Sequence, residues 1–334
     1  MSKRFDPRLL HAHLQPIAGL LNDSDITELV VNKPGEVAVE SKAGWVWHEV
    51  PELTDRVLDN LGRLIANSTN QALDANRPLV SAVLPGGERV QVVAPPAVES
   101  GRYSLTVRKP SVVDLSMDDL EKGGLFDSVT KPGEQDAPME AELGKLYKAG
   151  EWSAFLKLAV NARKNILISG ATGSGKTTLS KALIAHIPKE ERLLTIEDTR
   201  ELTAPHRNVV HMLYSKGGQG KAAISAKELL EASLRMRPDR ILLQELRDGT
   251  AFYYLRNVNS GHPGSITTVH ADSATLAFEQ LTLLVKESEG GSDLARDDIR
   301  SLLRLLVDVV VQCKKHDGKF MITEVWYGGA DESK

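Results

Sequence analysis

Residues 170–177 form a glycine-rich segment whose residue types and spacing suit the binding of phosphate groups. The segment reads Gly170-Ala171-Thr172-Gly173-Ser174-Gly175-Lys176-Thr177, which fits the pattern G-x-x-x-x-G-K-[ST]. Glycines let consecutive backbone N–H groups curl around phosphate oxygens, the lysine amine reaches the β- and γ-phosphates, and the threonine hydroxyl ligates Mg²⁺. We therefore expect these eight residues, with the adjoining Thr178, to bind a nucleoside triphosphate and its Mg²⁺.

The flanking residues supply the elements that such a loop needs. Asn165 to Ser169 form a short apolar run of strand character, and Thr178 to Ile184 have the spacing of a helix with one buried side. A helix that begins at the loop directs its N–H groups and the positive end of its dipole at the phosphates. Because strand, loop and helix occur together, a chance glycine-rich turn is the weaker interpretation.

Two acidic clusters follow the loop, each at the end of a predicted strand. The first is Thr195-Ile196-Glu197-Asp198-Thr199-Arg200-Glu201, in which we expect Glu197 to ligate Mg²⁺ through water or to steer the nucleophile. Taken alone, a Glu-Asp pair is more often only a solvated surface feature. The second cluster ends the apolar run 240–243 in Gln244-Glu245. Glu245 is the candidate general base, facing the metal and polarising the attacking water.

A histidine and two arginines complete the candidate catalytic residues. His270 ends the strand-like run 265–269 and is placed to sense the γ-phosphate, although a single histidine there is more often structural. Arg89 and Arg108 line predicted strands near the N-terminus, where an arginine is usually an ordinary surface residue. A multi-subunit ATPase needs cationic groups that reach the triphosphate when its domains close, and this is their alternative role.

The chain divides into two domains and a linker. Its 334 residues suit about two domains, each with its own core. We expect a smaller α+β domain at 1–110 and an acidic linker at 111–150, which holds nine acidic against four basic residues. Residues 151–334 are predicted to form an α/β domain with a mainly parallel sheet.

Apolar periodicity and turn residues predict the elements of each domain. In the first domain the predicted helices lie near 14–21 and 53–67, and the strands at 26–32, 37–40, 44–50, 79–83, 89–93 and 103–108. The linker is expected to carry short helices at 117–121 and 141–148. In the second domain the strands are 165–169, 193–196, 240–243, 265–269, 308–312 and 320–326, and the helices 177–186, 226–236, 250–259, 275–286 and 297–306. This alternation favours helices on both faces of the sheet, with ligands at the carboxyl ends of its strands.

Composition narrows the possible partners. The formal net charge of −4 does not suit a bulk nucleic-acid or membrane-surface binder. Cys313 is the one cysteine, which excludes an intramolecular disulfide and a multi-cysteine zinc site and indicates a buried strand thiol in a reducing compartment. The N-terminal residues do not form a signal peptide, and apolar runs fall short of the ~20 residues that span a bilayer. We expect a cytoplasmic protein whose membrane contact is peripheral.

With these clusters in place, the chain resembles the secretion ATPases, the hexameric traffic ATPases of type II secretion, type IV secretion and type IV pili. Residues 170–177, 195–201, 237–247 and 261–270 are similar to their Walker A, Asp box, Walker B and His box. Residues 26–32, 87–91 and 106–111 are most similar to the VirB/Trw-type branch of type IV secretion and conjugation. The resemblance covers nearly the whole chain.

The resemblance implies a RecA-like ATPase domain in a homohexameric ring that hydrolyses Mg·ATP and transmits work through domain motions. It implies that Arg89 and Arg108 reach the phosphates and that Arg247 joins the nucleotide-binding residues. The implied partners are other secretion-system ATPases and inner-membrane components on the cytoplasmic face of the inner membrane. Direct DNA binding, and whether the cargo is protein or DNA, are left open.

The sequence departs from the family pattern at two positions. Gln244 stands where these ATPases usually have glycine, and Asp248 stands where a small residue is more common. The bulk of Gln244 is expected to slow hydrolysis, but Glu245 is intact, so we expect activity to be retained.

Other classes of protein are alternatives. An ABC-type ATPase is suggested by Ser215-Lys216-Gly217-Gly218-Gln219, but the segment before the phosphate loop is too long for that class and no aspartate precedes Glu245. A type II secretion motor would normally carry a four-cysteine metal site, and pilus motors match the N-terminal segments less well. A nucleotide-dependent docking switch that barely hydrolyses ATP is the alternative outside the motor class.

Overall fold

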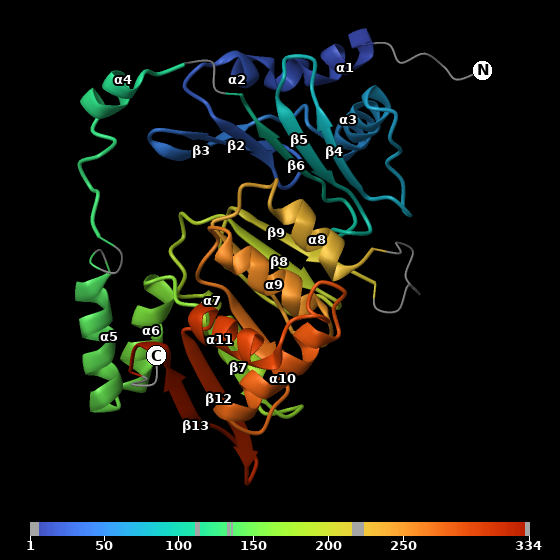
Figure 1. Cartoon of the computed structure of the whole chain (residues 1–334). Coiled ribbons are helices and arrows are strands. Elements are labelled where there is room, and N and C mark those ends of the chain that lie inside the picture. Colours follow the sequence, from blue (N-terminus) through green and yellow to red (C-terminus); the bar gives the residue numbers. More distant parts are fainter. Residues whose placement is uncertain (1–6, 111–113, 132–133, 135, 216–223, 331–334) are drawn as a thin grey trace.

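The computed structural model describes residues 7–110, 114–131, 134, 136–215 and 224–330 (Figure 1). An N-terminal domain lies above a larger C-terminal domain, and the chain between them runs down one side of the molecule. Residues 216–219, in the segment that suggested an ABC-type ATPase, lie outside the described residues.

The N-terminal domain is built on a six-stranded antiparallel sheet of order β3-β2-β1-β6-β5-β4. Its strands are β1 (Glu28–Val31), β2 (Glu36–Ser41), β3 (Gly44–Glu49), β4 (Leu79–Val83), β5 (Arg89–Val93) and β6 (Ser104–Arg108). Its helices are α1 (Pro7–Leu14), α2 (Ala18–Asn22) and α3 (Asp55–Ser68), with a short 3₁₀ turn, η1 (Gln15–Ile17), between the first two. The stretch expected to be helical near 14–21 is helical throughout, but it is divided among α1, η1 and α2, because Pro16 removes a backbone donor.

The segment between the domains contains two helices with different environments. α4 (Met117–Lys122) is a short helix that begins at a capping box formed by Ser116, and it has no buried residue. α5 (Ala137–Ala149) lies beside α6 (Trp152–Asn161), and its Leu143 is fully buried in the same core as Phe155. α5 therefore packs with the C-terminal domain, although the acidic composition of 111–150 predicted a linker as far as Gly150.

The C-terminal domain has the mainly parallel sheet that the sequence predicted. Its strands are β7 (Ile166–Gly170), β8 (Leu193–Glu197), β9 (Val209–Leu213), β10 (Arg240–Leu243), β11 (Ile266–Val269), β12 (Val309–His316) and β13 (Lys319–Tyr327). They form two parts, β10-β8-β9 and β11-β7-β12-β13, in which only the β12–β13 pair is antiparallel. The parts meet at a parallel bridge between Glu245 and Thr268.

Helices cover both faces of this sheet, as the alternation of elements predicted. They are α7 (Lys176–Ile184), α8 (Ala226–Ser233), α9 (Thr250–Asn259), α10 (Ala274–Lys286) and α11 (Arg296–Leu306), and the 3₁₀ turn η3 (Gly328–Ala330) ends the described chain. Successive strand residues point to opposite faces: Leu167 packs in one core with α8 to α11, whereas Ile166 and Ile168 pack in the other with α5 to α7. Within the described part of the chain, no helix is both long and apolar enough to cross a membrane.

The two domains of the chain share a polar interface along β9 and the start of β8. Arg192 is fully buried there, donates to Met236 O at 2.9 Å and Asn32 Oδ1 at 2.8 Å, and also bonds Asn208. A second contact is main-chain, since Leu213 N donates to Ala97 O at 2.8 Å. A buried guanidinium is stable only when its donors are satisfied, so these bonds fix the N-terminal domain on its own C-terminal domain.

Candidate nucleotide-binding site

The phosphate-loop residues occupy the turn between β7 and α7. α7 begins at Lys176, so its first N–H groups are not used within the helix and face the loop. Gly175 has φ +93°, a left-handed conformation that favours glycine, and a Cβ there would lie 3.1 Å from the ring of Phe320. A Cβ on Gly170 would meet the carbonyl oxygen of Cys313 on the neighbouring strand. The glycines therefore serve both the conformation of the loop and close packing.

The side chains of the loop are arranged for phosphate. Lys176 is buried, and its ammonium donates to Gly170 O at 2.6 Å and Ala171 O at 3.0 Å. Burial lowers the pKa of this amine, which the nearby Glu245 carboxylate partly offsets. The buried hydroxyl of Ser174 has no hydrogen-bond partner among the described residues. Phosphate oxygens would satisfy both groups, because they are strong acceptors.

Glu245 lies at the centre of a charged network at the strand ends. Its Oε1 is 2.9 Å from His270 Nε2, and its Oε2 accepts from Arg247 Nη2 at 2.6 Å. Arg247 also donates to Asp198 at 2.6 Å, which connects Glu245 to the first acidic cluster. Burial by itself raises the pKa of Glu245, but the bond from Arg247 and the charges of Arg247, His270 and Lys176 outweigh it and hold the pKa below the ordinary value. The carboxylate is therefore ionised at neutral pH.

The two glutamates of the first cluster have different environments. Glu197 is 0% exposed, and its carboxylate accepts from the Glu201 and Leu202 N–H groups at 2.7 Å and from Thr195 Oγ1 at 2.9 Å. Burial raises its pKa, but these bonds and that of His211 outweigh it, so the net shift is downward. Glu201 is exposed, and its Oε2 lies 3.5 Å from the Thr177 hydroxyl. The structure thus brings Glu201, and not Glu197, to the phosphate loop.

One cavity of about 350 Å³ joins most of the predicted site residues. Its lining consists of Thr172, Gly173, Ser174, Gly175, Lys176, Thr177, Thr178, Glu201, Gln244, Glu245, Arg247, Thr268, His270 and Phe320. The order of strands explains the convergence, because β7, β11, β10 and β8 are neighbours and their carboxyl ends meet at one edge. Gln244, the departure from the family pattern, also lines this cavity.

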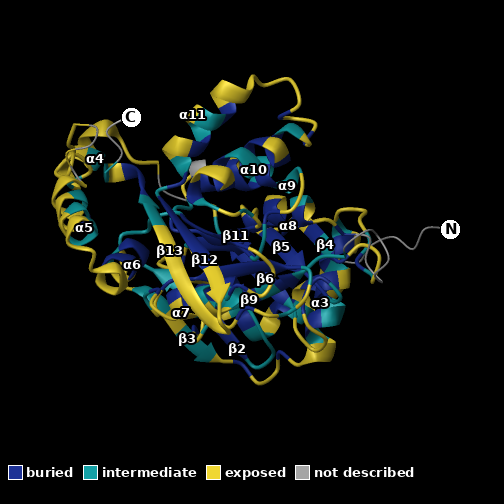
Figure 2. Ribbon diagram, turned by 90° about the horizontal axis from the view of Figure 1, so that it is seen from below, coloured by how far each residue is buried: buried dark blue, intermediate teal, exposed yellow. Residues whose placement is uncertain are grey.

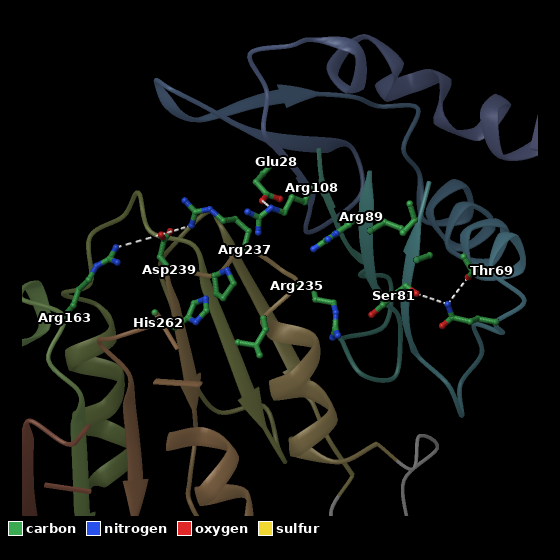
Figure 3. Close-up of a pocket in the computed structure, with 17 residues that line it drawn as sticks. Glu28, Thr69, Ser81, Arg89, Arg108, Arg163, Arg235, Arg237, Asp239 and His262 are labelled. Atoms are coloured by element: carbon green, nitrogen blue, oxygen red, sulfur yellow. Dashed lines mark hydrogen bonds and ion pairs between the residues drawn. The ribbon is translucent and has the colours of Figure 1, made fainter. Parts of the chain in front are cut away.

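Arg89 and Arg108 lie elsewhere, at a second cavity of about 780 Å³ (Figure 3). They are direct cross-strand partners on β5 and β6, and Arg108 lies 3.4 Å from Glu28. The C-terminal domain contributes Arg237 and the residues around it, which precede β10, whereas Glu245 follows that strand. The four residues of β10, at about 3.3 Å each, separate these two groups of residues. The two cavities therefore open at opposite ends of the strands. Within one chain these two arginines do not join the phosphate loop.

Three residues that line the phosphate cavity, Glu201, Thr268 and Phe320, were not predicted from the sequence. Glu201 lies within the acidic cluster 195–201, and Thr268 lies within the strand-like run 265–269, so the sequence pointed to both segments but not to these residues. The signal for Phe320 was its place near the start of the predicted strand 320–326, but nothing local connected that strand with the loop. All three are residues that the tertiary fold brings to the site.

The chain is similar to known proteins over most of its length. The family described as Type II/IV secretion system protein matches residues 136–328. The Type IV secretion system protein VirB11 of Bartonella henselae is 52% identical over 325 residues, covering 94% of this chain and 91% of that protein. The Type IV secretion system protein PtlH of Bordetella pertussis is 42% identical over 325 residues, 94% of each chain. The crystal structure of the VirB11 ATPase from the Brucella suis type IV secretion system, in complex with sulphate, has 44% identity and a TM-score of 0.91, covering 96% of this chain and 95% of that one.

The fold and the site together define a P-loop ATPase whose phosphate loop, acidic strand ends and histidine share one sheet edge. This confirms the resemblance to secretion ATPases that the sequence suggested. The chain belongs to the Type II/IV secretion system protein family, and within it to the VirB11-type ATPases.

Proposed function

We propose that this ATPase hydrolyses Mg·ATP at the cavity of residues 172–178 and powers type IV secretion or conjugative transfer as a homohexameric ring. The observation that carries the proposal is the meeting of Lys176, Glu245 and His270: His270 lies 3.5 Å from the lysine amine and 2.9 Å from the carboxylate. A phosphate-binding cation and a carboxylate able to act on water need to stand this close around one γ-phosphate.

Each residue has a role that follows from its contacts. Lys176 and the N–H groups at the start of α7 bind the phosphates. Glu245, ionised and held by Arg247 and His270, orients and polarises the attacking water. His270 contacts both Lys176 and Glu245, so its contacts change according to whether a γ-phosphate is bound. Arg247 keeps Glu245 in position and ties it to Asp198.

Mg²⁺ fits the oxygen groups beside the loop. The Thr177 hydroxyl and the exposed Glu201 carboxylate are hard ligands close to each other, and Mg²⁺ typically binds one or two carboxylates together with substrate phosphates. The metal would neutralise phosphate charge. We assign Glu201 the role that the sequence suggested for Glu197, because the Glu197 oxygens are already occupied by protein donors.

A ring would complete the site with Arg89 and Arg108 from a neighbouring subunit. Arg89 and Arg108 lie opposite each other on adjacent strands, and their cavity also holds Arg163, Arg235 and Arg237 against the acids Glu28 and Asp239, so cations outnumber carboxylates there. The phosphate loop and this cationic cavity lie at opposite edges of one chain, which is the arrangement of a head-to-tail contact that closes into a ring. Motion between subunits would then bring the arginines to the phosphates or withdraw them.

The secretion context supplies the remaining assignments. The VirB11 and PtlH relatives are named as type IV secretion system proteins, so we propose the same setting for this chain, with other secretion ATPases and inner-membrane components as partners. Peripheral association with the cytoplasmic face of the inner membrane is part of that proposal. The domain boundaries we propose are residue 110 and the start of α5, since α5 packs with the ATPase domain.

Phosphate release by three proteins tests the motor function against a nucleotide-dependent docking switch. We expect wild type to release phosphate from Mg·ATP, Lys176→Ala to lose both binding and release, and Glu245→Gln to bind ATP but to release phosphate at least about 100-fold more slowly. Equal and slow release by all three proteins would leave only the docking switch. Sedimentation with and without ATP checks the ring, and a strict monomer under both conditions excludes it.

A further inference from the structure

One aromatic side chain stands exposed at the mouth of the phosphate cavity. Phe320 is 58% exposed, yet it lines the same cavity as the phosphate loop. Leaving a phenyl ring exposed to water is less favourable in free energy than burying it, so a ligand that covers the ring would gain from the contact. The proposed phosphate chemistry does not use this ring, because phenyl neither donates to phosphate nor ligates a metal.

The strand β12 is responsible for the position of this ring. β12 pairs with β7 as far as Cys313, which lies opposite Gly170, and then continues to His316. The three further residues carry the β12–β13 hairpin about 10 Å beyond the end of β7. Asp317 and Gly318, both with positive φ, form its two-residue turn. The hairpin is exposed over this length, where it is drawn in yellow in Figure 2.

The ring has one supported side and one open side. Its Cβ, Cγ and Cδ1 atoms face Gly175, where an added Cβ would lie 3.1 to 3.4 Å from them. Its cross-strand partner Lys315 places an ammonium 5.5 Å from the ring centroid. The residue as a whole remains 58% exposed beside the cavity. The ring is thus a flat apolar surface held against the backbone of the phosphate loop.

The ends of the cavity are chemically distinct. Lys176, Glu245 and His270 contact one another and mark the end where the γ-phosphate reacts. Phe320 contacts the loop at Gly175 and lies outside that network. A nucleotide whose γ-phosphate is at the network must direct its ribose and base out of the loop, toward the cavity mouth.

We propose that Phe320 is the surface on which the base of the bound nucleotide stacks. The inference rests on the proposed triphosphate site and adds the part of the ligand that the loop does not bind. Aromatic rings stack on bases of every kind, because every base has a π-face. A phenyl ring has no hydrogen-bonding group with which to choose among them, so Phe320 adds affinity for ATP and GTP alike.

The test compares ligands with and without a base, by calorimetry in the presence of Mg²⁺. The probes are the non-hydrolysable imido analogues of ATP and GTP, and inorganic tripolyphosphate. We expect Phe320→Ala to weaken both nucleotide analogues about tenfold, or about 1.4 kcal/mol, and to leave tripolyphosphate within about twofold of wild type. Phe320→Tyr keeps the ring and should bind like wild type. Met321→Ala is the matched control, since Met321 is 41% exposed on the same strand but does not line the cavity.

Two outcomes would overturn the inference while leaving the triphosphate site in place. If Phe320→Ala weakens tripolyphosphate as much as the nucleotides, the ring only supports the loop; if the nucleotides are unaffected, no base reaches it. Failure of all three probes to bind wild type, or equal binding by Lys176→Ala, overturns the proposed function itself. A triphosphate of 2-aminopurine riboside adds a direct signal: its fluorescence should be quenched by wild type and Phe320→Tyr, and restored in Phe320→Ala.

Discussion

The guanidinium of Arg247 lies 2.6 Å from the carboxylate of Glu245, two residues earlier in the chain. The same guanidinium is 2.6 Å from Asp198, so one side chain ties the ends of β10 and β8 together. Burial raises the pKa of Glu245, and the hydrogen bond and charge of Arg247 counter this effect together with the charges of His270 and Lys176. Arg247 therefore sets both the position and the ionisation of the carboxylate proposed to act on water.

Replacing Arg247 should change the pH dependence of ATP hydrolysis. In wild type the lowered pKa keeps Glu245 ionised, so phosphate release should not lose activity through this group until the pH falls below the ordinary glutamate value. In Arg247→Met the pKa of Glu245 rises, so the loss of activity on the acid side of the pH profile should begin at a higher pH than in wild type. Activity at pH 7 should be at least about tenfold lower. Rates measured between pH 5 and 8 check this, with Arg247→Lys as the charge-retaining control. An acid limb identical to that of wild type would contradict it.

Substitution of the two glutamates of the Thr195–Glu201 cluster should have opposite consequences. Glu197→Gln removes the charge and one of the two oxygens of a buried carboxylate that accepts from the Glu201 and Leu202 N–H groups and from Thr195, and it should lower the free energy of unfolding by about 1–3 kcal/mol. Glu201→Gln should leave stability unchanged and raise the Mg²⁺ concentration needed for half-maximal activity. Chemical denaturation and Mg²⁺ titration distinguish the two. Loss of Mg²⁺ response in Glu197→Gln alone, at unchanged stability, would reverse our assignment.

Mixing inactive subunits should restore ATPase activity if the site is shared between neighbours. Lys176→Ala lacks the phosphate loop's cation, and the double variant Arg89→Ala/Arg108→Ala lacks the proposed arginines. In rings assembled from equal amounts of both, about a quarter of the interfaces would pair an intact loop with intact arginines. Each variant mixed with itself is the control. Mixed rings as inactive as their parents would argue that the arginines do not act between subunits.

Glu28 should make folding stability depend on pH between about 4.5 and 7. Burial raises its pKa from 4.5 to about 7, although Arg108 opposes the shift. Between these values the folded chain binds more protons than the unfolded chain, so the Glu28 contribution is full below pH 4.5 and is lost as pH rises to 7. The loss is at most about 3 kcal/mol. Glu28→Gln should be more stable than wild type at pH 7.5, with the difference vanishing near pH 4.5. Denaturation at both values measures it, and an equal difference at both would refute it.

Local sequence patterns predicted most elements and missed those that depend on distant partners. The bounds of β4, β5, β10 and α9 agree with prediction, because apolar periodicity and turn residues fix them locally. The strand β9 was missed: His211 stands in the middle of this five-residue segment, and its pairing with β8 is decided by the fold. α6 was missed in the same way, since its buried face exists only against α5 and the sheet.

The sequence by itself determined the chemistry of this protein: a glycine loop with its lysine and threonine, acids and a histidine after strands, and therefore a triphosphate site. Only the tertiary structure decided which of these groups share a cavity. Glu197 is the last residue of β8 and turns into the protein, whereas Glu201, beyond the turn, reaches Thr177. Strand order brings four carboxyl ends together and leaves Arg89 and Arg108 at the opposite edge. Periodicity along a chain records which residues are buried, but strand order and side-chain direction arise from contacts between segments far apart in sequence.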